Sequence, residues 1–134
     1  MTARIAELGR EHPQLSVEAQ AVLREASLAG TDLMDYRHAI MHGSLMPFPS
    51  MPAFRRKPPA RKAQPHVAHV DAKLLDMALD SAWTLCRVVA ALTAACHDST
   101  KMASLSAMRQ EVYRARLSAS ELRHLTEMVN DEKY

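Results

Sequence analysis

"DAKLLDMALDSAWTLCRVVAALTAAC", residues 71–96, is the clearest helical pattern in the chain. Its apolar residues recur every three or four positions, the spacing that places side chains on one face of an α-helix. They are Leu74, Ala78, Ala82, Leu85, Val89, Leu92 and Cys96. Leu75, Leu79, Cys86 and Val88 widen this face. We therefore predict a helix from about Asp71, a suitable N-cap, to Cys96, buried against more than one neighbour and with Trp83 in the core.

A second long helix is predicted upstream, from about Ser16 to His42. Its stripe consists of Ala19, Leu23, Ala26, Gly30, Leu33, Arg37 and Ile40. Gly30 and Thr31 interrupt the run, so the segment is either one helix or two helices with a kink, the second capped by Thr31 or Asp32. Gly43 fits the left-handed position that ends many helices. A short helix over residues 2–9 is expected to end before Pro13.

Two shorter helices are predicted after the long one. The first covers residues 101–117, and the second opens with the capping-box sequence of residues 118–121 and continues through Leu122, Leu125 and Val129. Residues 47–70 contain six of the seven prolines, so this segment is expected to be edge strand or loop.

Composition agrees with a helical protein. Aromatic residues make up only 4% of the 134 residues, which favours helices over sheets. We expect an all-α fold, a small bundle of about four to five helices with a proline-rich basic loop between two helical blocks. It forms a single domain over residues 1–134, with N-terminal helices in 1–46, the loop in 47–70 and C-terminal helices in 71–134.

The charge pattern points to the middle of the chain. The formal net charge is only +2, but residues 47–70 carry five basic and no acidic side chains. Any polyanion contact is therefore expected there. The first residues lack the apolar core of a signal peptide, and no stretch has 18 uncharged apolar residues, so we expect a soluble cytoplasmic protein without membrane contact. Cys86 and Cys96 are about 15 Å apart along one predicted helix, too far for a disulfide.

The stretch "DYRHAIMHG", residues 35–43, combines an arginine, two histidines and a glycine at the end of the predicted upstream helix. Arg37 is followed five residues later by His42 and then by Gly43. This pattern resembles the HEPN superfamily, whose members carry an arginine, a polar residue after it and a histidine four to six residues beyond. His38 occupies the polar position. The resemblance extends to the helical bundle and to residues 75–92 after a basic spacer, although only 36 residues precede Arg37.

The resemblance implies a metal-independent endoribonuclease without a cofactor, of a toxin or defence type. In such enzymes a 2′-hydroxyl attacks the adjacent 3′-phosphate. His42 would be the acid or base, Arg37 would stabilise phosphate charge, and His38 would complete the catalytic set. The basic residues of the loop would bind RNA; they are Arg55, Arg56, Lys57, Arg61 and Lys62. The plainer interpretation of these five is a solvated linker.

A partner is also implied. Five residues along a regular helix turn the chain by about 500°, so Arg37 and His42 point roughly 140° apart and aim poorly at one phosphate. A composite site across a homodimer, the habit of the family, would combine two such pairs. An antitoxin or nucleotidyltransferase partner is a further expectation from the resemblance.

Other interpretations compete. His42 can be an ordinary helix-terminal residue, and Arg37 can pair with Asp32 or Asp35. A metal site would need His38 and His42 together with residues such as His66, His69, Cys86 or His97, and it lacks a supporting motif. The whole domain can also be a non-catalytic module that binds a nucleotide or a protein. DNA binding through residues 105–125 is the weakest alternative, because that segment lacks a clear recognition helix.

Overall fold

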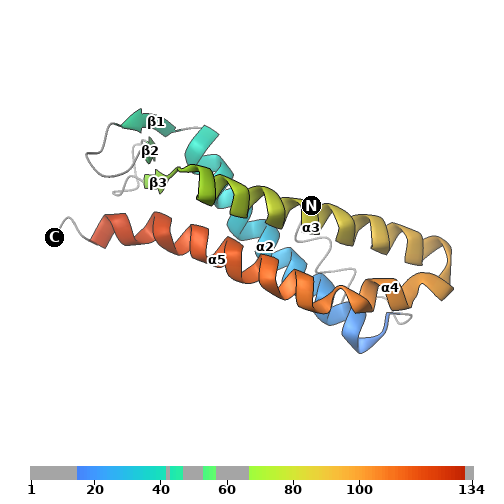
Figure 1. Ribbon diagram of the computed structural model, residues 1–134. Helices are drawn as coiled ribbons and strands as arrows, with labels where there is room; N and C mark the ends of the chain where they lie inside the picture. The colour runs from blue at the N-terminus through green and yellow to red at the C-terminus, as the bar shows by residue number, and fades with distance from the viewer. Residues whose placement is uncertain (1–14, 42, 47–52, 57–66, 132–134) are drawn as a thin grey trace, which may run out of the picture.

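A computed structural model describes residues 15–41, 43–46, 53–56 and 67–131, with side chains over 15–41 and 70–125 (Figure 1). Its elements are α2 (Val17–Met41), β1 (Gly43–Met46), β2 (Ala53–Arg56), β3 (Val67–His69), α3 (Ala72–His97), the 3₁₀ turn η1 (Ser99–Lys101), α4 (Met102–Ala107) and α5 (Arg109–Asp131). The predicted all-α bundle is confirmed. The helix expected over residues 2–9 lies outside the described residues.

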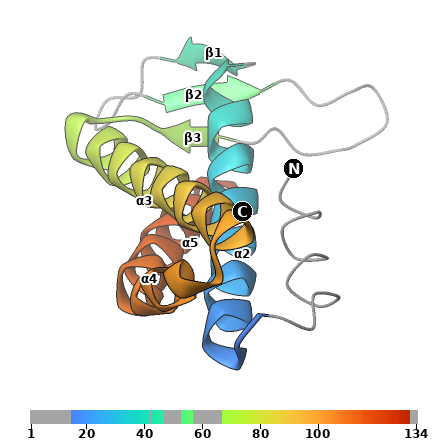
Figure 2. The ribbon, with the colours of Figure 1, turned by 90° about the vertical axis from the view of Figure 1, so that its right-hand side faces the viewer.

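Three long helices form the bundle. In Figure 1, α3 and α5 run side by side in opposite directions and α2 crosses behind them; Figure 2 shows α2 on one side of this pair. The extensive helix contacts are those of α5 with α2 and of α5 with α3. Helix α5 therefore packs against both other long helices.

The predicted start of α3 is confirmed. Asp71 caps the helix, and its side chain accepts a hydrogen bond from the Leu74 backbone N–H at 2.7 Å. This bond satisfies one of the backbone donors that the first helical turn leaves without a partner. The helix ends at His97, one residue beyond the predicted end.

Helix α2 is continuous through Gly30 and Thr31. The Thr31 hydroxyl donates to the Ser27 carbonyl at 3.1 Å, within the helix, and does not cap a new one. Gly30 is buried, so its missing side chain serves helix packing. The prediction that Gly43 ends the helix in a left-handed conformation is wrong. Gly43 begins strand β1, and no described residue has a positive φ.

The predicted helix boundary at residues 118–121 is also wrong. Helix α5 runs unbroken through this segment, and the break falls earlier, at Met108. Ala115, Ala119 and Leu122 continue one buried face along α5. Packing of that face keeps the chain helical where the local sequence offered a cap.

The inner face of α3 differs from the predicted stripe. Its buried residues are Leu74, Ser81, Val88 and Ala95. Ala82, Val89 and Cys96, which were predicted to be buried, are exposed, and Trp83 is 69% exposed instead of lying in the core. Because α2 and α5 cover only one side of α3, only part of its wide apolar surface is buried.

Buried side chains form two clusters. The first core cluster consists of Ala19, Val22, Leu23, Ala26, Val88, Leu105, Met108 and Val112. The second core cluster consists of Tyr36, Ala39, Leu74 and Leu122. The first cluster therefore joins the N-terminal part of α2 to α4 and the start of α5, and the second joins the C-terminal part of α2 to the start of α3 and to α5.

Three short strands lie between α2 and α3. β2 and β3 lie within residues 47–70, the segment expected to be edge strand or loop, whereas β1 lies before it, in the part expected to hold only helices. They form an antiparallel sheet in the order β1-β2-β3. The sheet contacts α2, and β3 also contacts α5. Figure 2 shows the three strands stacked across one end of the bundle.

Among the described helices, only α3 is long and apolar enough to cross a membrane by length and composition. The core helix of a soluble protein passes the same test, so this property by itself assigns no location.

Candidate functional site

The C-terminal turns of α2 are fixed by their inner face. Tyr36 and Ala39 are both 3% exposed in the second core cluster, and the half-buried Ile40 packs against it. Three of five consecutive residues therefore hold this part of the helix against α3 and α5. Residues on its outer side are positioned by a rigid element, which favours their use in a site.

Arg37 lies on this outer side and is exposed, whereas His38 is half-buried. Arg37 was predicted to belong to the buried stripe, but Tyr36 takes the inward position instead. Arg37 forms no ion pair with another described residue, and the side chain of Asp32 is bound by α5. Among the described residues, none forms an ion pair with the Arg37 guanidinium, so this group is accessible to a ligand.

The strand register brings two basic residues to the end of this helix. Gly43 pairs with Arg56 and Ser44 pairs with Arg55, in the antiparallel ladder of β1 and β2. Paired Cα atoms in such a ladder are about 4.5–5.5 Å apart. The backbone of Arg55 and Arg56 therefore lies beside the residues that directly follow His42. His42, Lys57, Arg61 and Lys62 lie outside the described residues.

Tyr36 is a poor candidate for proton transfer. Burial, assisted by the negative charge of Asp71, raises the pKa of the Tyr36 phenol from 10.0 to about 12. The phenol therefore keeps its proton throughout the neutral range. Its contribution to this site is to anchor α2.

A buried ionic cluster lies nearer the middle of α2. The Asp32 side chain, 5% exposed, accepts hydrogen bonds from Arg116 at 2.5 Å and from Arg123 at 3.0 Å. The Nε atom of Arg116 also lies 3.7 Å from a carboxylate oxygen of Glu25. These contacts tie α2 to α5 and neutralise a carboxylate that would otherwise be costly to bury.

Sequence reasoning missed this cluster. Ala29, Asp32, Tyr36 and Ala39 follow one another at three- and four-residue spacing, and all are buried. An acidic residue within such a series was the available signal. The same contacts weaken the DNA alternative, because Arg116 and Arg123 of residues 105–125 are paired to protein carboxylates.

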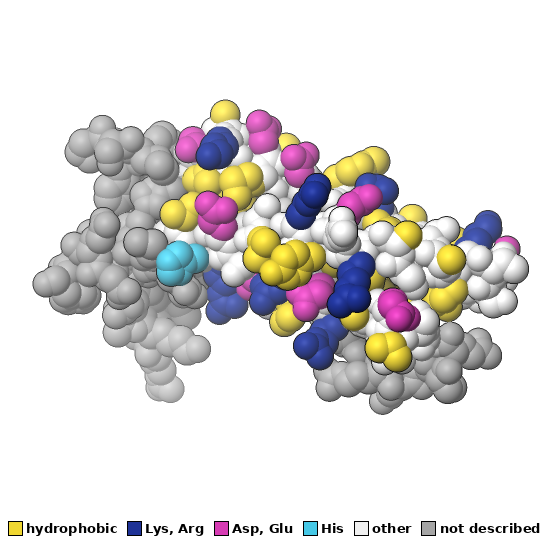
Figure 3. Space-filling view, turned by 60° about the horizontal axis from the view of Figure 1, so that its bottom comes forward, with side chains coloured by type: hydrophobic (Ala, Val, Ile, Leu, Met, Phe, Trp, Pro, Cys, Tyr) yellow, Lys and Arg dark blue, Asp and Glu magenta, His cyan; other side chains and the backbone are white. Residues whose placement is uncertain are grey.

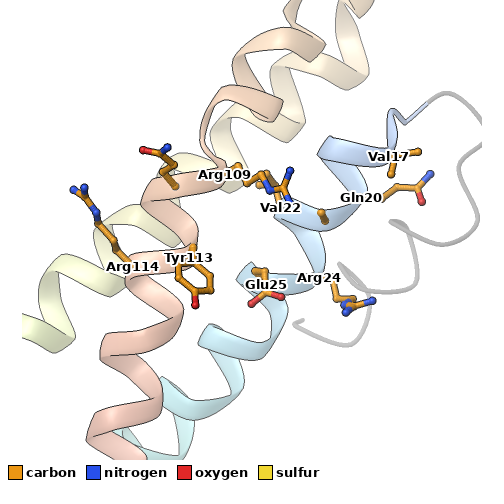
Figure 4. Close-up of a pocket in the computed structure, with 10 residues that line it drawn as sticks. Val17, Gln20, Val22, Arg24, Glu25, Arg109, Tyr113 and Arg114 are labelled. Carbon is orange, nitrogen blue, oxygen red and sulfur yellow. The ribbon is translucent and has the colours of Figure 1, made fainter.

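A groove lies between the starts of α2 and α5 (Figure 4). Its lining residues are Val17, Gln20, Ala21, Val22, Arg24, Glu25, Arg109, Gln110, Tyr113 and Arg114. Three arginines give it a basic character, and Tyr113 is 56% exposed. Thirteen residues of α2 separate Arg24 from Arg37, about 20 Å along the helix axis. The groove is therefore separate from the site at residues 35–43 and has no histidine lining it.

Charge on the rest of the described surface is mixed. On the side of the molecule at the bottom of Figure 1, acidic and basic side chains alternate with hydrophobic patches (Figure 3). A large patch of one sign is absent from the described part of that face, so the basic groups discussed above are local features.

No group of three potential metal ligands occurs among the described residues. Of the residues considered for a metal site, Cys86 and His97 are exposed on α3, and His69 belongs to β3. His42 and His66 lie outside the described residues.

No model of a known protein family matches the chain, and searches of curated proteins and of solved structures also found no match. The resemblance to the HEPN superfamily therefore rests on residues 35–43 and 75–92 and on their setting in a helical bundle.

Proposed function

We propose that this protein is a metal-independent endoribonuclease of the HEPN type, with its site at the junction of α2 and the β-sheet. The observation that carries the proposal is the exposed Arg37 on a helix turn fixed by Tyr36 and Ala39, with the backbone of Arg55 and Arg56 paired beside the residues after His42. The backbone of two basic residues thus lies beside the end of the helix that carries Arg37.

The chemistry divides among three residues. His42 acts as acid or base, since an imidazole with a pKa near 6.5 exchanges protons at neutral pH. Arg37 stabilises the charge that develops on the phosphate while the 2′-hydroxyl attacks it, because its planar fork suits phosphate oxygens. His38 orients the substrate or the other two side chains. No cofactor takes part.

RNA would be held mainly through its phosphates. Arg55, Arg56, Lys57, Arg61 and Lys62 supply the positive charge in this proposal, so binding is salt-sensitive and tolerant of sequence. The protein acts in the cytoplasm, as a homodimer, and an antitoxin or nucleotidyltransferase controls it. No membrane is required.

The test compares purified wild type with Arg37→Ala and His42→Ala on total RNA in EDTA. We expect wild-type cleavage that leaves 2′,3′-cyclic phosphate ends, and a loss on the order of a hundredfold or more in either variant. Lys101→Ala is the control, because Lys101 is an exposed basic residue of η1 that belongs neither to this site nor to the groove lining. Cleavage that persists in Arg37→Ala or His42→Ala would contradict the assignment.

A second function is favoured by the groove between α2 and α5. Arg24, Arg109 and Arg114 can hold phosphate groups, and Tyr113 offers a ring on which a base can stack. In this alternative the protein is a non-catalytic module that binds nucleotides. Nucleotide binding without turnover, lost in Arg24→Ala and kept in Arg37→Ala, would favour it over the ribonuclease.

A further inference from the structure

Helix α3 carries a second apolar seam on its outer side. We call this surface the outer seam. It consists of Leu75, Leu79, Ala82, Cys86, Val89 and Thr93. All six are exposed, and Leu79 is 66% exposed. None of the six bears a charge, and Trp83 lies directly beside them. Such a continuous uncharged strip is unusual on the surface of a monomer.

The spacing of the residues in the outer seam indicates which kind of structural element can pack against it. Successive members are alternately four and three residues apart, so the pattern repeats every seven residues. This is the heptad period of a left-handed coiled coil, in which each side chain enters a hole on a facing helix. The inner face of α3 has the same period, at Leu74, Ser81, Val88 and Ala95, and is covered by helices. A helix is therefore the expected occupant of the outer seam.

We infer that the occupant is a second copy of this chain, with α3 packed against the α3 of its partner. The positions of the outer seam are spaced symmetrically in the sequence about Thr84. In an antiparallel pair of α3 helices, Leu79 of one copy therefore faces Val89 of the other, and Ala82 faces Cys86. Each pair of facing residues contains only apolar or small side chains. Trp83, 69% exposed, would then lie next to the two-fold axis, the central position at which tryptophan contributes most to an interface.

The area is sufficient for association. Residues 75–93 extend about 27 Å along the helix. Covering the outer seam and Trp83 would remove on the order of 500 Å² from each copy, or about 1,000 Å² in all, the size that a specific interface requires.

The flanks of α3 favour a protein over a lipid surface. Lys73 and Arg87 are balanced by Asp76 and Asp80, whereas helices that lie on membranes carry an excess of basic residues on their polar side. Arg87 is also bound to Glu111 of α5 at 2.6 Å, which holds α3 within the bundle. The pairing uses α3 and not residues 35–43, so it stands independently of the proposed ribonuclease activity.

The test measures the mass of the full chain in reducing buffer by sedimentation velocity over a wide dilution series. We expect a species of two 14.9 kDa chains that dissociates on dilution. Leu79→Glu should weaken association by about 30-fold or more, the loss typical of a central interface residue, while the helical circular dichroism is unchanged. Leu117→Glu is the matched control, since Leu117 is 52% exposed on α5 and lies outside the seam; it should remain dimeric.

Trp83 gives a second readout, because it is the single tryptophan of the chain. Its emission should shift to longer wavelength as the wild type is diluted and should already be shifted in Leu79→Glu. A wild type that is monomeric at every concentration would overturn the inference. So would equal loss of the dimer in the Leu79 and Leu117 variants, or a monomer whose Trp83 emission changes only on adding phosphatidylcholine vesicles.

Discussion

The two ends of the bundle are built differently. Five of the six largest fully buried side chains, Val22, Leu23, Val88, Leu105 and Val112, belong to the first core cluster, and only Leu122 belongs to the second. The second cluster also contains a phenol, and the ionic cluster of Asp32 lies on the same helix one turn away. The apolar end therefore carries most of the stability. The end of the bundle that carries Arg37 has fewer large buried apolar side chains and contains buried polar groups.

The largest expected effect is at the first core cluster. Leu23→Ala should lower the free energy of unfolding by about 3–4 kcal/mol, because a fully buried leucine is replaced by a cavity. Urea denaturation followed by circular dichroism measures it. Leu28→Ala, at a 43% exposed position on the same helix, should cost less than about 1 kcal/mol. Equal losses in the two variants would show that the first cluster is not the main core.

A smaller loss is expected between the two ends. Asp32→Ala removes the carboxylate that Arg116 and Arg123 share, and should lower the free energy of unfolding by about 2 kcal/mol. Both arginines are partly exposed and can be rehydrated, which limits the cost. The same urea titration measures it, with the exposed Asp35→Ala as control at less than about 0.5 kcal/mol. If the two aspartates behave alike, the ionic cluster does not join α2 to α5.

The contribution of Tyr36 in the second core cluster to the free energy of unfolding should decrease at high pH. The pKa of Tyr36 is about 12 in the folded protein, against 10.0 for an ordinary tyrosine. Below pH 10 both states keep the proton and its contribution is complete. Between pH 10 and 12 only the unfolded state loses the proton, so stability should fall, by up to about 2 kcal/mol. Urea titrations from pH 8 to 12 should show a shallower decline in Tyr36→Phe; the same decline in both proteins would exclude Tyr36 as its source.

The smallest effect on stability is expected at Arg37. Because this side chain is exposed and unpaired with any described residue, Arg37→Ala should change the free energy of unfolding by less than about 0.5 kcal/mol. Thermal and urea denaturation measure it. A loss of RNA cleavage in a fully stable variant would separate function from folding, whereas a loss of several kcal/mol would make Arg37 a structural residue.

Part of the proposed site was accessible from sequence and part was not. Arg37, His38 and His42 were proposed from their spacing, and the basic residues of 47–70 from their clustering. The pairing of Arg56 with Gly43 could not be foreseen, because a strand register depends on a turn whose geometry the prolines leave open. The groove of Arg24, Arg109 and Arg114 was missed because its arginines come from two helices far apart in the chain.

The sequence by itself determined the start of α3 at Asp71 and the helical character of the residues on either side of Gly30, since capping and periodicity act within a few residues. It left open whether the helix continues through Gly30. Only the tertiary structure decided that Trp83 is exposed while Val88 is buried, that Asp32 meets two arginines of α5, and that Ser118 lies inside a helix and not at its start. Each of these outcomes depends on which neighbour covers a surface. Helix α3 offers two apolar seams of the same period, and a single chain covers only one of them.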